Sequence, residues 1–524
     1  MGAIFGVWFF TVKQGISLRF NDIATRLPLA SLLVPVRRVA AMLTPSRLAR
    51  YSSAILLLPF APRAVDWSKI PFGAVLRKLY DSTPRKAGDF FTIRLGAHAN
   101  TLIIVALVAK EASTFERLQT AGKLARAALE SEPESLLIWQ QGLDEDTAAS
   151  TLCAAVAAVE AAAFALASFK NTPKPRLLAR IDLSRAAKLP ELDLTLATAG
   201  GNNLARWLTA LPPNRLDAAA YRRYLQALAR HLRIKFTFYG ERRLKRMGAG
   251  AFLAVSQGNG SSDAGIVHLA YRPGDSKAPI LSLVGKGICF DTGGINLKAH
   301  KGMLDMHTDM QGSAVAVGAL YALHALRSPL SVDCWLAITE NRIGPLAYKP
   351  QDVVRAHNGT TIQVIHTDAE GRMVLADALS IASAQKPRAI IDYATLTGAC
   401  VNALTERYSG AFTNRPAARD LIEAAGNISG ERVWCFPMDA DFDADLDSKV
   451  ADVQQCTPDG KGDHILAARF LNRFVPNNIA WLHLDLAAGV RSGGLAHIST
   501  DITGFGVRYT LALLRNGWLS RDRK

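Results

Sequence analysis

One stretch, residues 366–377 (HTDAEGRMVLAD), constrains this chain more than any other. The six residues before it, 360–365 (TTIQVI), are rich in β-branched side chains and predict a strand. If the extended geometry continues, Asp368, Glu370 and Arg372 project from one face, because side chains alternate along a strand. The apolar residues that follow have a helical spacing. Two carboxylates and a guanidinium where a strand gives way to a helix indicate a polar site that suits a divalent metal beside an anion.

A second polar cluster lies upstream. An apolar run, residues 280–284, predicts a strand that opens into a glycine-rich loop over residues 285–298. Four residues of this loop and the segment after it could bind ions or anions: Lys286, Asp291, Lys298 and Asp309. Taken singly, an Asp beside a glycine turn is most often a turn or helix-cap residue, so single residues do not decide a metal role.

Together the two clusters resemble the leucyl aminopeptidase family, peptidase family M17, whose members are two-metal cytosolic exopeptidases. Four motifs carry the resemblance: TDAEGR at 367–372, GKG-x3-D-x-GG-x3-K at 285–298, ATLTGA at 394–399 and HLDLAAG at 483–489. The similarity runs from about residue 195 to the C-terminus. Four separate motifs in one order make a chance match very improbable.

The resemblance implies two divalent metal ions, Zn²⁺ or Mn²⁺, with Mg²⁺ and Co²⁺ as alternatives. It implies five ligands: Lys286, Asp291, Asp309, Asp368 and Glu370. Asp291 and Glu370 are expected to bridge both ions, Asp368 to complete one site, and Lys286 with Asp309 to complete the other. An ammonium has no lone pair, so Lys286 coordinates only as the neutral amine, after nearby cations displace its proton.

Two further residues are expected to be catalytic. In the family, the counterpart of Lys298 stays charged and stabilises the developing oxyanion. The counterpart of Arg372 holds a bicarbonate ion that acts as the general base, and a guanidinium fits a planar anion with two prongs. The implied reaction is attack of a metal-activated water on the first peptide bond, with the free N-terminal amine bound to one metal.

Substrate-binding positions also carry over. Met306, Thr395, Gly398 and Ala487 match positions that line the family's apolar pocket for the N-terminal side chain, and Ala369 is grouped with them. His366 stands beside the expected site for the second residue of the substrate. The resemblance therefore implies release of N-terminal residues, apolar ones preferred, from short peptides.

With 524 residues, 49% of them hydrophobic, the chain predicts two α/β domains. We expect an N-terminal extension over 1–62, a smaller α/β domain over 63–190, and a larger catalytic α/β domain with a mostly parallel sheet over 191–524. The extension is apolar, basic and poor in acids, which fits a transit peptide or a mis-assigned start codon equally well. Its apolar runs are shorter than a membrane span requires.

Several elements are expected from periodicity. In the first domain, 101–107 predicts a strand, 114–129 a helix, and 147–169 an alanine-rich internal helix, with 170–190 as the connection. In the second, helices are predicted over 313–326 and 373–384. Strands are predicted over 236–239, 252–255, 266–271, 280–284, 332–338, 361–365 and 389–393.

Composition limits the remaining function classes. The six cysteines are scattered, which suits a reducing, cytoplasmic location. The net charge of +16 includes nine Lys/Arg against one acid within 222–246, which predicts a solvated helix face followed by an edge strand. A DNA-binding or regulatory protein on the same scaffold is the alternative that this cluster leaves open. A phosphatase is less favoured, since phosphate sites favour several cationic or backbone donors.

The resemblance further implies a homohexamer, and no integral membrane span is expected.

Overall fold

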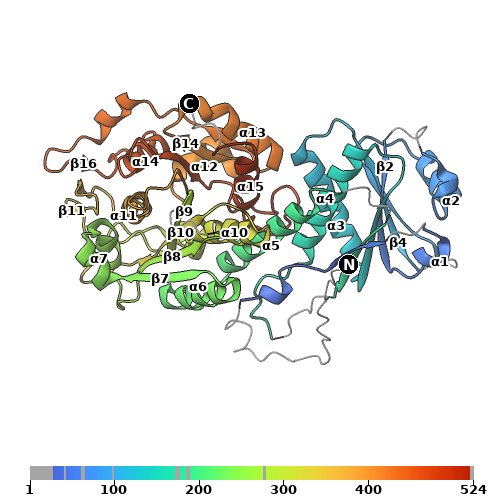
Figure 1. Cartoon of the computed structure of the whole chain (residues 1–524), viewed down its shortest axis with the longest axis horizontal. Coiled ribbons are helices and arrows are strands. Elements are labelled where there is room, and N and C mark those ends of the chain that lie inside the picture. Colours follow the sequence, from blue (N-terminus) through green and yellow to red (C-terminus); the bar gives the residue numbers. More distant parts are fainter. Residues whose placement is uncertain are drawn as a thin grey trace.

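Two β-sheets, one in each half of the chain, carry the fold, and α5 (Leu192–Thr209) lies between them (Figure 1). α5 contacts helices of both halves, α4 (Glu145–Ala163) and α10 (Gln311–Ala325). The computed structural model describes residues 27–39, 43–60, 65–96, 100–171, 177–184, 189–274 and 279–519. The two α/β halves agree with the predicted fold class.

The first sheet has six strands in the order β1-β6-β5-β2-β4-β3. Their bounds are β1 Val36–Val39, β2 Ser53–Pro59, β3 Phe90–Arg94, β4 Leu102–Val108, β5 Ser135–Gln140 and β6 Arg180–Ser184. β3 pairs antiparallel with β4, and the other neighbours are parallel. β2 is buried along almost its whole length, as expected for a central parallel strand covered on both faces.

This sheet corrects two predicted boundaries. The sequence predicts an extension over residues 1–62, but β1 and β2 within it are strands of the first sheet, with β2 between β4 and β5. β6 likewise lies inside the stretch predicted as a connection, 170–190. The basic, acid-poor composition around β2 masks a five-residue apolar run, Ala54–Leu58, that is a buried strand. Residues 1–26 lie outside the described part, and the extension stays a prediction for them.

Helices cover both faces of the first sheet. α3 (Thr114–Leu129) begins with a capping box between Ser113 and Glu116, and Asp144 caps the start of α4, where its carboxylate accepts the Thr147 N–H. Both pack on one face, while α1 (Pro45–Leu48) and α2 (Gly73–Asp81) pack on the other. Among the described residues, α4 alone has the length and hydropathy of a membrane span, and 72% of that window is buried. The predicted internal helix is confirmed, although it ends at Ala163.

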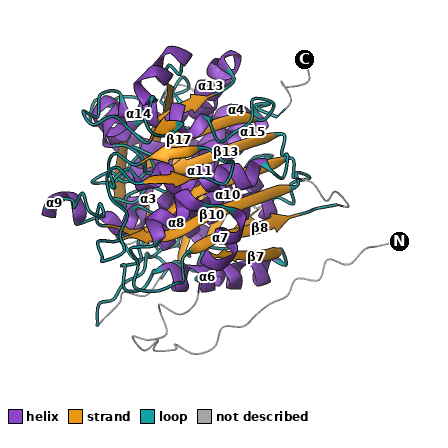
Figure 2. Cartoon of the chain, turned by 90° about the vertical axis from the view of Figure 1, so that its left-hand side faces the viewer, coloured by secondary structure: helices purple, strands orange, loops and turns teal. Residues whose placement is uncertain are grey.

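The second sheet has eight strands in the order β15-β14-β17-β13-β9-β10-β8-β7 (Figure 2). Their bounds are β7 Lys235–Gly240, β8 Gly265–Tyr271, β9 Leu281–Asp291, β10 Val332–Asn341, β13 Ala389–Ala394, β14 Ser409–Thr413, β15 Val433–Cys435 and β17 Ala480–Asp485. The four central strands, β17, β13, β9 and β10, are parallel, while β7, β8 and β14 make antiparallel pairs towards the edges. The parallel centre agrees with the prediction.

The two faces of this sheet have separate cores. Neighbouring residues of β9 alternate between them, since Leu283 belongs to one core and Val284 to the other. The Leu283 side holds α5, α10, α6 (Ala218–Leu232), α13 (Arg419–Ser429) and α15 (Val507–Arg515). The Val284 side holds α7 (Glu241–Met247), α8 (Gly250–Ser256), α11 (Glu370–Ser383) and α14 (Asp463–Asn472). The remaining α-helices are α9 His300–Met303 and α12 Gly398–Leu404. A small sheet holds β11 Val353–Arg355, β12 Thr361–Gln363 and β16 Val453–Gln454.

Two local predictions are wrong. Residues 252–255, predicted as a strand, lie in the helix α8, because a four-residue apolar run has no period that separates a strand from a buried helix. Residues 285–291, predicted as a glycine-rich loop, continue the strand β9. Their glycines permit close packing there: a Cβ on Gly285 would lie 2.4 Å from the Ser313 Cα of α10.

Asp377 ties α11 to its surroundings and gives a stability prediction. Its carboxylate accepts the N–H of Phe252 at 2.8 Å and of His357 at 2.7 Å. Asp377→Ala leaves the buried N–H of Phe252 and the partly buried N–H of His357 unpaired, so we expect the free energy of unfolding to fall by about 3 kcal/mol. Burial raises the pKa of Asp377 to about 7. A carboxyl whose pKa is raised on folding stabilises most at low pH, so the loss is larger at pH 5 than at pH 8.

Urea unfolding followed by tryptophan fluorescence measures this loss. Asp439→Ala is the matched control, since Asp439 is exposed and its side chain caps no helix N–H. We expect its midpoint to stay close to that of the unchanged protein. An Asp377→Ala protein that unfolds at the same urea concentration as this control contradicts the anchoring role.

Candidate active site

Polar residues collect where the central parallel strands end. Asp291 ends β9, Asn341 ends β10 and Asp485 ends β17, while Thr395 directly follows β13. In open α/β sheets, ligands bind outside the carboxyl ends of parallel strands. Asp291 pairs with Asn341 across a register shift between β9 and β10, so the two chains meet at this edge.

The sequence places Asp368, Glu370 and Arg372 on one face of an extended segment, and this is wrong. β12 ends at Gln363, and α11 begins at Glu370. Residues two apart on a helix point about 200° away from each other, so Glu370 and Arg372 face different partners. The sequence does not mark the end of the strand, because residues 364–369 contain no glycine or proline.

The Lys286 ammonium lies among carboxylates. Its Nζ is 2.9 Å from Asp309 Oδ1, 2.8 Å from Glu370 Oε1, and donates to the Thr395 carbonyl at 2.9 Å. Ligand atoms of Asp291, Asp309 and Glu370 all lie within 4.8 Å of one another, and all three residues are buried. Three carboxylates taken from β9, the segment before α10, and α11 therefore converge on one point.

Gly371, in the first turn of α11, makes this approach sterically feasible. A Cβ at Gly371 would lie 2.7 Å from both Cε and Nζ of Lys286. Any larger residue would push the lysine away from Glu370. Packing against Lys286 thus explains why the TDAEGR motif has a glycine at this position.

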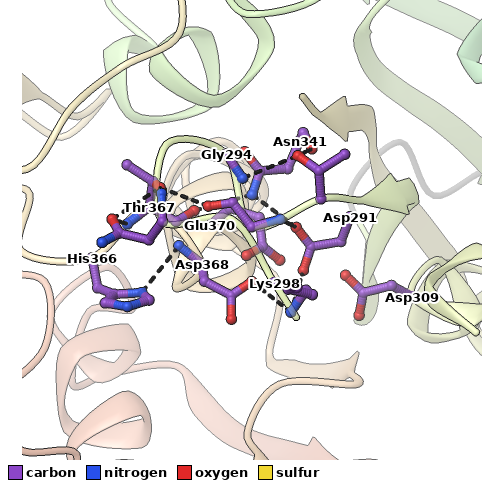
Figure 3. A network of polar contacts seen from close by, with 12 residues as sticks. Asp291, Gly294, Lys298, Asp309, Asn341, His366, Thr367, Asp368 and Glu370 are labelled. Carbon is purple, nitrogen blue, oxygen red and sulfur yellow. Dashed lines mark hydrogen bonds and ion pairs between the residues drawn. The ribbon is translucent and has the colours of Figure 1, made fainter. Parts of the chain in front are cut away.

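Lys298 joins two other carboxylates of the cluster (Figure 3). Its Nζ lies 2.9 Å from Asp291 Oδ2 and 2.5 Å from Asp368 Oδ1. Burial lowers the pKa of Lys298, but the neighbouring carboxylates, Asp291 and Glu370 foremost, outweigh it and raise the pKa above its ordinary value. Lys298 is therefore held as a cation.

A hydrogen-bond network fixes the backbone on both sides of these groups (Figure 3). Asn341 Nδ2 donates to Asp291 Oδ1 at 2.8 Å and to the Thr367 carbonyl at 3.0 Å. The same carbonyl accepts the Tyr348 hydroxyl at 2.7 Å, and the Thr367 hydroxyl donates to the Gly293 carbonyl at 2.6 Å. The loop after β9 and the segment before α11 are thus joined, which holds Asp291 beside Asp368.

The donor set fits divalent cations. Asp309 Oδ2 and Glu370 Oε2 are buried and have no hydrogen-bond partner among the described residues. Burial first, and then the nearby carboxylates, raise the pKa of Glu370 to about 8 and that of Asp309 to about 6. Burial lowers the pKa of Lys286, but Asp309, Glu370 and Asp291 outweigh it and raise the pKa. The raised pKa values mean that bound protons offset the negative charge of this site. Two divalent cations could supply the same positive charge, which buried carboxylates require.

Arg372 has a partner that the sequence did not reveal. Its Nη2 lies 2.8 Å from both carboxylate oxygens of Asp463, the first residue of α14, and its Nη1 donates to the Gln455 carbonyl at 3.0 Å. The Arg372 side chain is 2% exposed and that of Asp463 is 24% exposed. The only sequence signal for Asp463 is its glycine-rich context, residues 458–463 (PDGKGD), which lies outside the four motifs.

A cavity of about 640 Å³ unites these groups. All thirteen predicted site residues line it: Lys286, Asp291, Lys298, Met306, Asp309, His366, Asp368, Ala369, Glu370, Arg372, Thr395, Gly398 and Ala487. Val401, Val490, Cys456 and Asp463 line it too and were missed. The two valines carry no chemical signature, so only the fold brings them to the cavity. The volume suits a small ligand of a few residues.

The basic residues of 222–246 do not line this cavity. They fall on α6, the edge strand β7 and α7, and most of them are exposed. Arg222 packs over the Phe238 ring and Arg243 over the Tyr239 ring. The predicted solvated face and edge strand are confirmed, and nothing described here favours a nucleic-acid site.

Comparison with known proteins now decides the family. The model of the "Cytosol aminopeptidase family, catalytic domain" matches residues 203–511. The probable cytosol aminopeptidase of Parasynechococcus marenigrum (strain WH8102) is 39% identical over 433 residues, which cover 80% of this chain and 87% of the relative. The chain belongs to the cytosol aminopeptidase family. It is accordingly a metal-dependent aminopeptidase, as the four motifs predict.

Other relatives of this aminopeptidase agree. The probable cytosol aminopeptidase of Synechococcus sp. (strain JA-3-3Ab) is 36% identical over 482 residues, covering 87% of this chain and 92% of the relative. A tomato leucine aminopeptidase mutant superposes with a TM-score of 0.78 at 26% identity, covering 92% of this chain and 96% of that one. The bottromycin maturation enzyme BotP in complex with Mn gives 0.76 at 30% identity, covering 88% and 99%. These similarities extend across both sheets.

Proposed function

We propose that this aminopeptidase removes N-terminal residues, apolar ones preferred, from short peptides by two-metal hydrolysis. The observation that carries the proposal is the buried cluster of Asp291, Asp309 and Glu370 around Lys286, which opens into the cavity. Three buried carboxylates, of which Asp309 and Glu370 each have an unpaired oxygen, require cations, and a cavity of this size accepts one end of a peptide.

Five residues are proposed as metal ligands. Asp291 and Glu370 would be shared by the two ions, Asp368 would help to hold one of them, and Lys286 with Asp309 would help to hold the other. Zn²⁺ or Mn²⁺ is proposed, with Mg²⁺ and Co²⁺ as alternatives, and the Mn complex of the relative BotP supports a manganese-compatible fold. When bound, such ions lower the pKa of water and polarise a carbonyl oxygen. Lys286 must lose its proton to take part, so metal binding releases protons and is favoured by rising pH.

Lys298 is proposed to stabilise the oxyanion. Its raised pKa supports this role, since the ammonium stays charged at neutral pH. Its Nζ already lies between Asp291 and Asp368, so it needs little rearrangement to face a carbonyl oxygen in the cavity. A cation held in place before the reaction costs no reorganisation as negative charge develops.

The substrate side of the cavity is mixed in character. Met306, Ala487, Val401 and Val490 give it apolar walls, which supports an apolar pocket for the N-terminal side chain. Thr395, Gly398, Ala369 and His366 are proposed as the other substrate-binding positions. The Thr395 hydroxyl donates to Asp309 Oδ1 at 2.7 Å, so this residue also orients a proposed ligand.

Assembly and location are proposed from the family. A homohexamer would place the active sites in an interior cavity, where only short peptides with a free N-terminus could reach them. The cytoplasm is proposed as the location because the relatives are named cytosol aminopeptidases. The free buried cysteines are compatible with a reducing compartment.

Hydrolysis of a panel of aminoacyl amides and their N-acetylated forms tests the proposal. With Mn²⁺ or Zn²⁺ added, we expect leucyl and methionyl amides to be cleaved, because a free amine can bind a metal. The acetylated amides lack that amine and are expected to react at least a hundredfold more slowly, a difference of about 3 kcal/mol. Equal cleavage of free and acetylated amides contradicts an aminopeptidase that reads the free N-terminus.

A further inference from the structure

The family resemblance assigns Arg372 to a bicarbonate ion, but the guanidinium is already bound to a carboxylate of the chain. Arg372 Nη2 lies 2.8 Å from Asp463 Oδ1 and 2.8 Å from Oδ2, and Nη1 is bound to the Gln455 carbonyl. Among the described residues only Nε of this guanidinium lacks a hydrogen-bond partner. A charge-assisted pair of this kind is one of the strongest hydrogen-bonded contacts in proteins.

This pairing conflicts with a free planar anion. A guanidinium presents two forks to such an anion, the end fork of Nη1 and Nη2 and the side fork of Nε and Nη2. Both forks include Nη2, which here faces Asp463. Bicarbonate bound through either fork would share Nη2 with the Asp463 carboxylate, and two anions so close together repel each other. The residues present therefore do not fit bicarbonate.

Asp463 is held in place by the chain around it. Gly462, at φ 60°, turns the backbone into α14, so Asp463 occupies the first turn of a helix, where a negative charge is favourable. The segment before it is fixed by Gln455, whose Oε1 accepts the N–H groups of Ile365 and His366 at 3.1 Å and whose Nε2 donates to the Ala369 carbonyl at 2.9 Å. The strands β12 and β16 join the same two segments. The carboxylate position is thus built into the fold.

We propose that Asp463 takes the place of bicarbonate and is the proton acceptor of the reaction. Its carboxylate lines the same cavity as the proposed metal ligands and is partly exposed to it. Asp463 accepts one proton from the attacking water, whose oxygen bonds to the scissile carbonyl carbon. The carbon–nitrogen bond then breaks, and the proton passes from Asp463 to the leaving amine nitrogen. Arg372 orients the carboxylate and keeps its charge balanced. The inference rests on the proposed function.

Turnover of leucyl amide in bicarbonate-free buffer, with and without added bicarbonate, tests the proposal. The unchanged protein should give the same kcat under both conditions. Asp463→Ala frees the Arg372 guanidinium, so its kcat should fall about a hundredfold without bicarbonate and rise again as bicarbonate or formate is added. Asp463→Asn keeps the shape and a hydrogen-bond acceptor but not the charge, and it should stay slow, because the amide blocks the site. Asp447→Asn, an exposed change that lies outside the cavity lining, should behave as the unchanged protein.

A binding measurement separates this inference from activity. Bicarbonate should raise the melting temperature of Asp463→Ala by stabilising the folded state, and leave that of the unchanged protein unaffected. If the unchanged protein cleaves leucyl amide only with bicarbonate and is itself stabilised by it, the inference is wrong and the proposed function stands. If neither protein cleaves the amide with metal and bicarbonate present, the proposed function fails instead. Should Asp463→Ala not fold, Asp463→Asn decides, since full turnover of that variant overturns the proton-acceptor role.

Discussion

Glu370→Gln should lower kcat for leucyl amide by about a thousandfold or more. Glu370 Oε1 lies 2.8 Å from Lys286 Nζ, its Oε2 has no hydrogen-bond partner among the described residues, and the side chain is buried. In the proposed function it bridges both ions, so the amide weakens two sites at once. A metal that polarises a carbonyl and activates water contributes several kcal/mol to the barrier, and each 1.36 kcal/mol is a factor of ten.

Glutamine has nearly the same shape as glutamate, so the substitution tests the charge rather than the packing. It replaces one oxygen with a similar-sized amide nitrogen, so the packing around Lys286 and Gly371 changes little. Glu145→Gln makes the same chemical change on the exposed first turn of α4 and should leave kcat unchanged. Metal content measured by mass spectrometry should fall in the first variant only. Normal turnover of Glu370→Gln with normal metal content would rule out Glu370 as a bridging ligand.

Lys298→Gln should lower kcat by about a hundredfold to a thousandfold while changing KM little. Loss of one preorganised donor to an oxyanion typically has an effect of this size. An interaction made only in the transition state lowers kcat and kcat/KM together. Because neighbouring carboxylates raise the pKa of Lys298, its ammonium is expected to stay charged at neutral pH.

Lys298 also neutralises Asp291 and Asp368, so a second readout is needed. The metal affinity of Lys298→Gln should stay the same or rise, because the competing ammonium has gone. Lys301→Gln, an exposed change on α9, is the control for loss of one positive charge nearby. A variant that loses its metals with its activity would show that Lys298 is structural rather than a donor to the reacting carbonyl.

Much of the fold is predictable where one period dominates. α3 and β13 match their predicted ranges to within a residue, because long amphipathic or continuous apolar segments have a single reading. α8 is different, since its seven residues include only a short apolar run that fits a strand equally well. The sequence does not predict β2, because the basic, apolar composition around it outweighs the strand signal of five apolar residues. In these cases tertiary packing decides what local pattern cannot.

The candidate site likewise has a part that the sequence predicts and a part that only the fold reveals. Residues in the four motifs meet in one cavity, because each motif ends a central parallel strand or begins the helix beside it. Asp463 lies about ninety residues after Arg372 and outside every motif, and the pairing of β12 with β16, together with the hydrogen bonds of Gln455, brings the two segments together. Although the strand period predicts it, Arg372 does not share a face with Glu370, because both residues lie in the helix α11. The family motifs thus predict residues that line one cavity, but they do not predict the partner of the guanidinium.

Titration of metal-free protein with Mn²⁺ or Zn²⁺ tests the central claim most directly. The protein is stripped with a chelator, and release of leucine from leucyl amide is followed as metal is added at a protein concentration well above the dissociation constant. Four carboxylates and one amine are proposed to hold two ions, so activity should begin near zero and level off at two metal equivalents per chain. Full activity of the metal-free protein, or a plateau after one equivalent, would contradict a two-metal aminopeptidase.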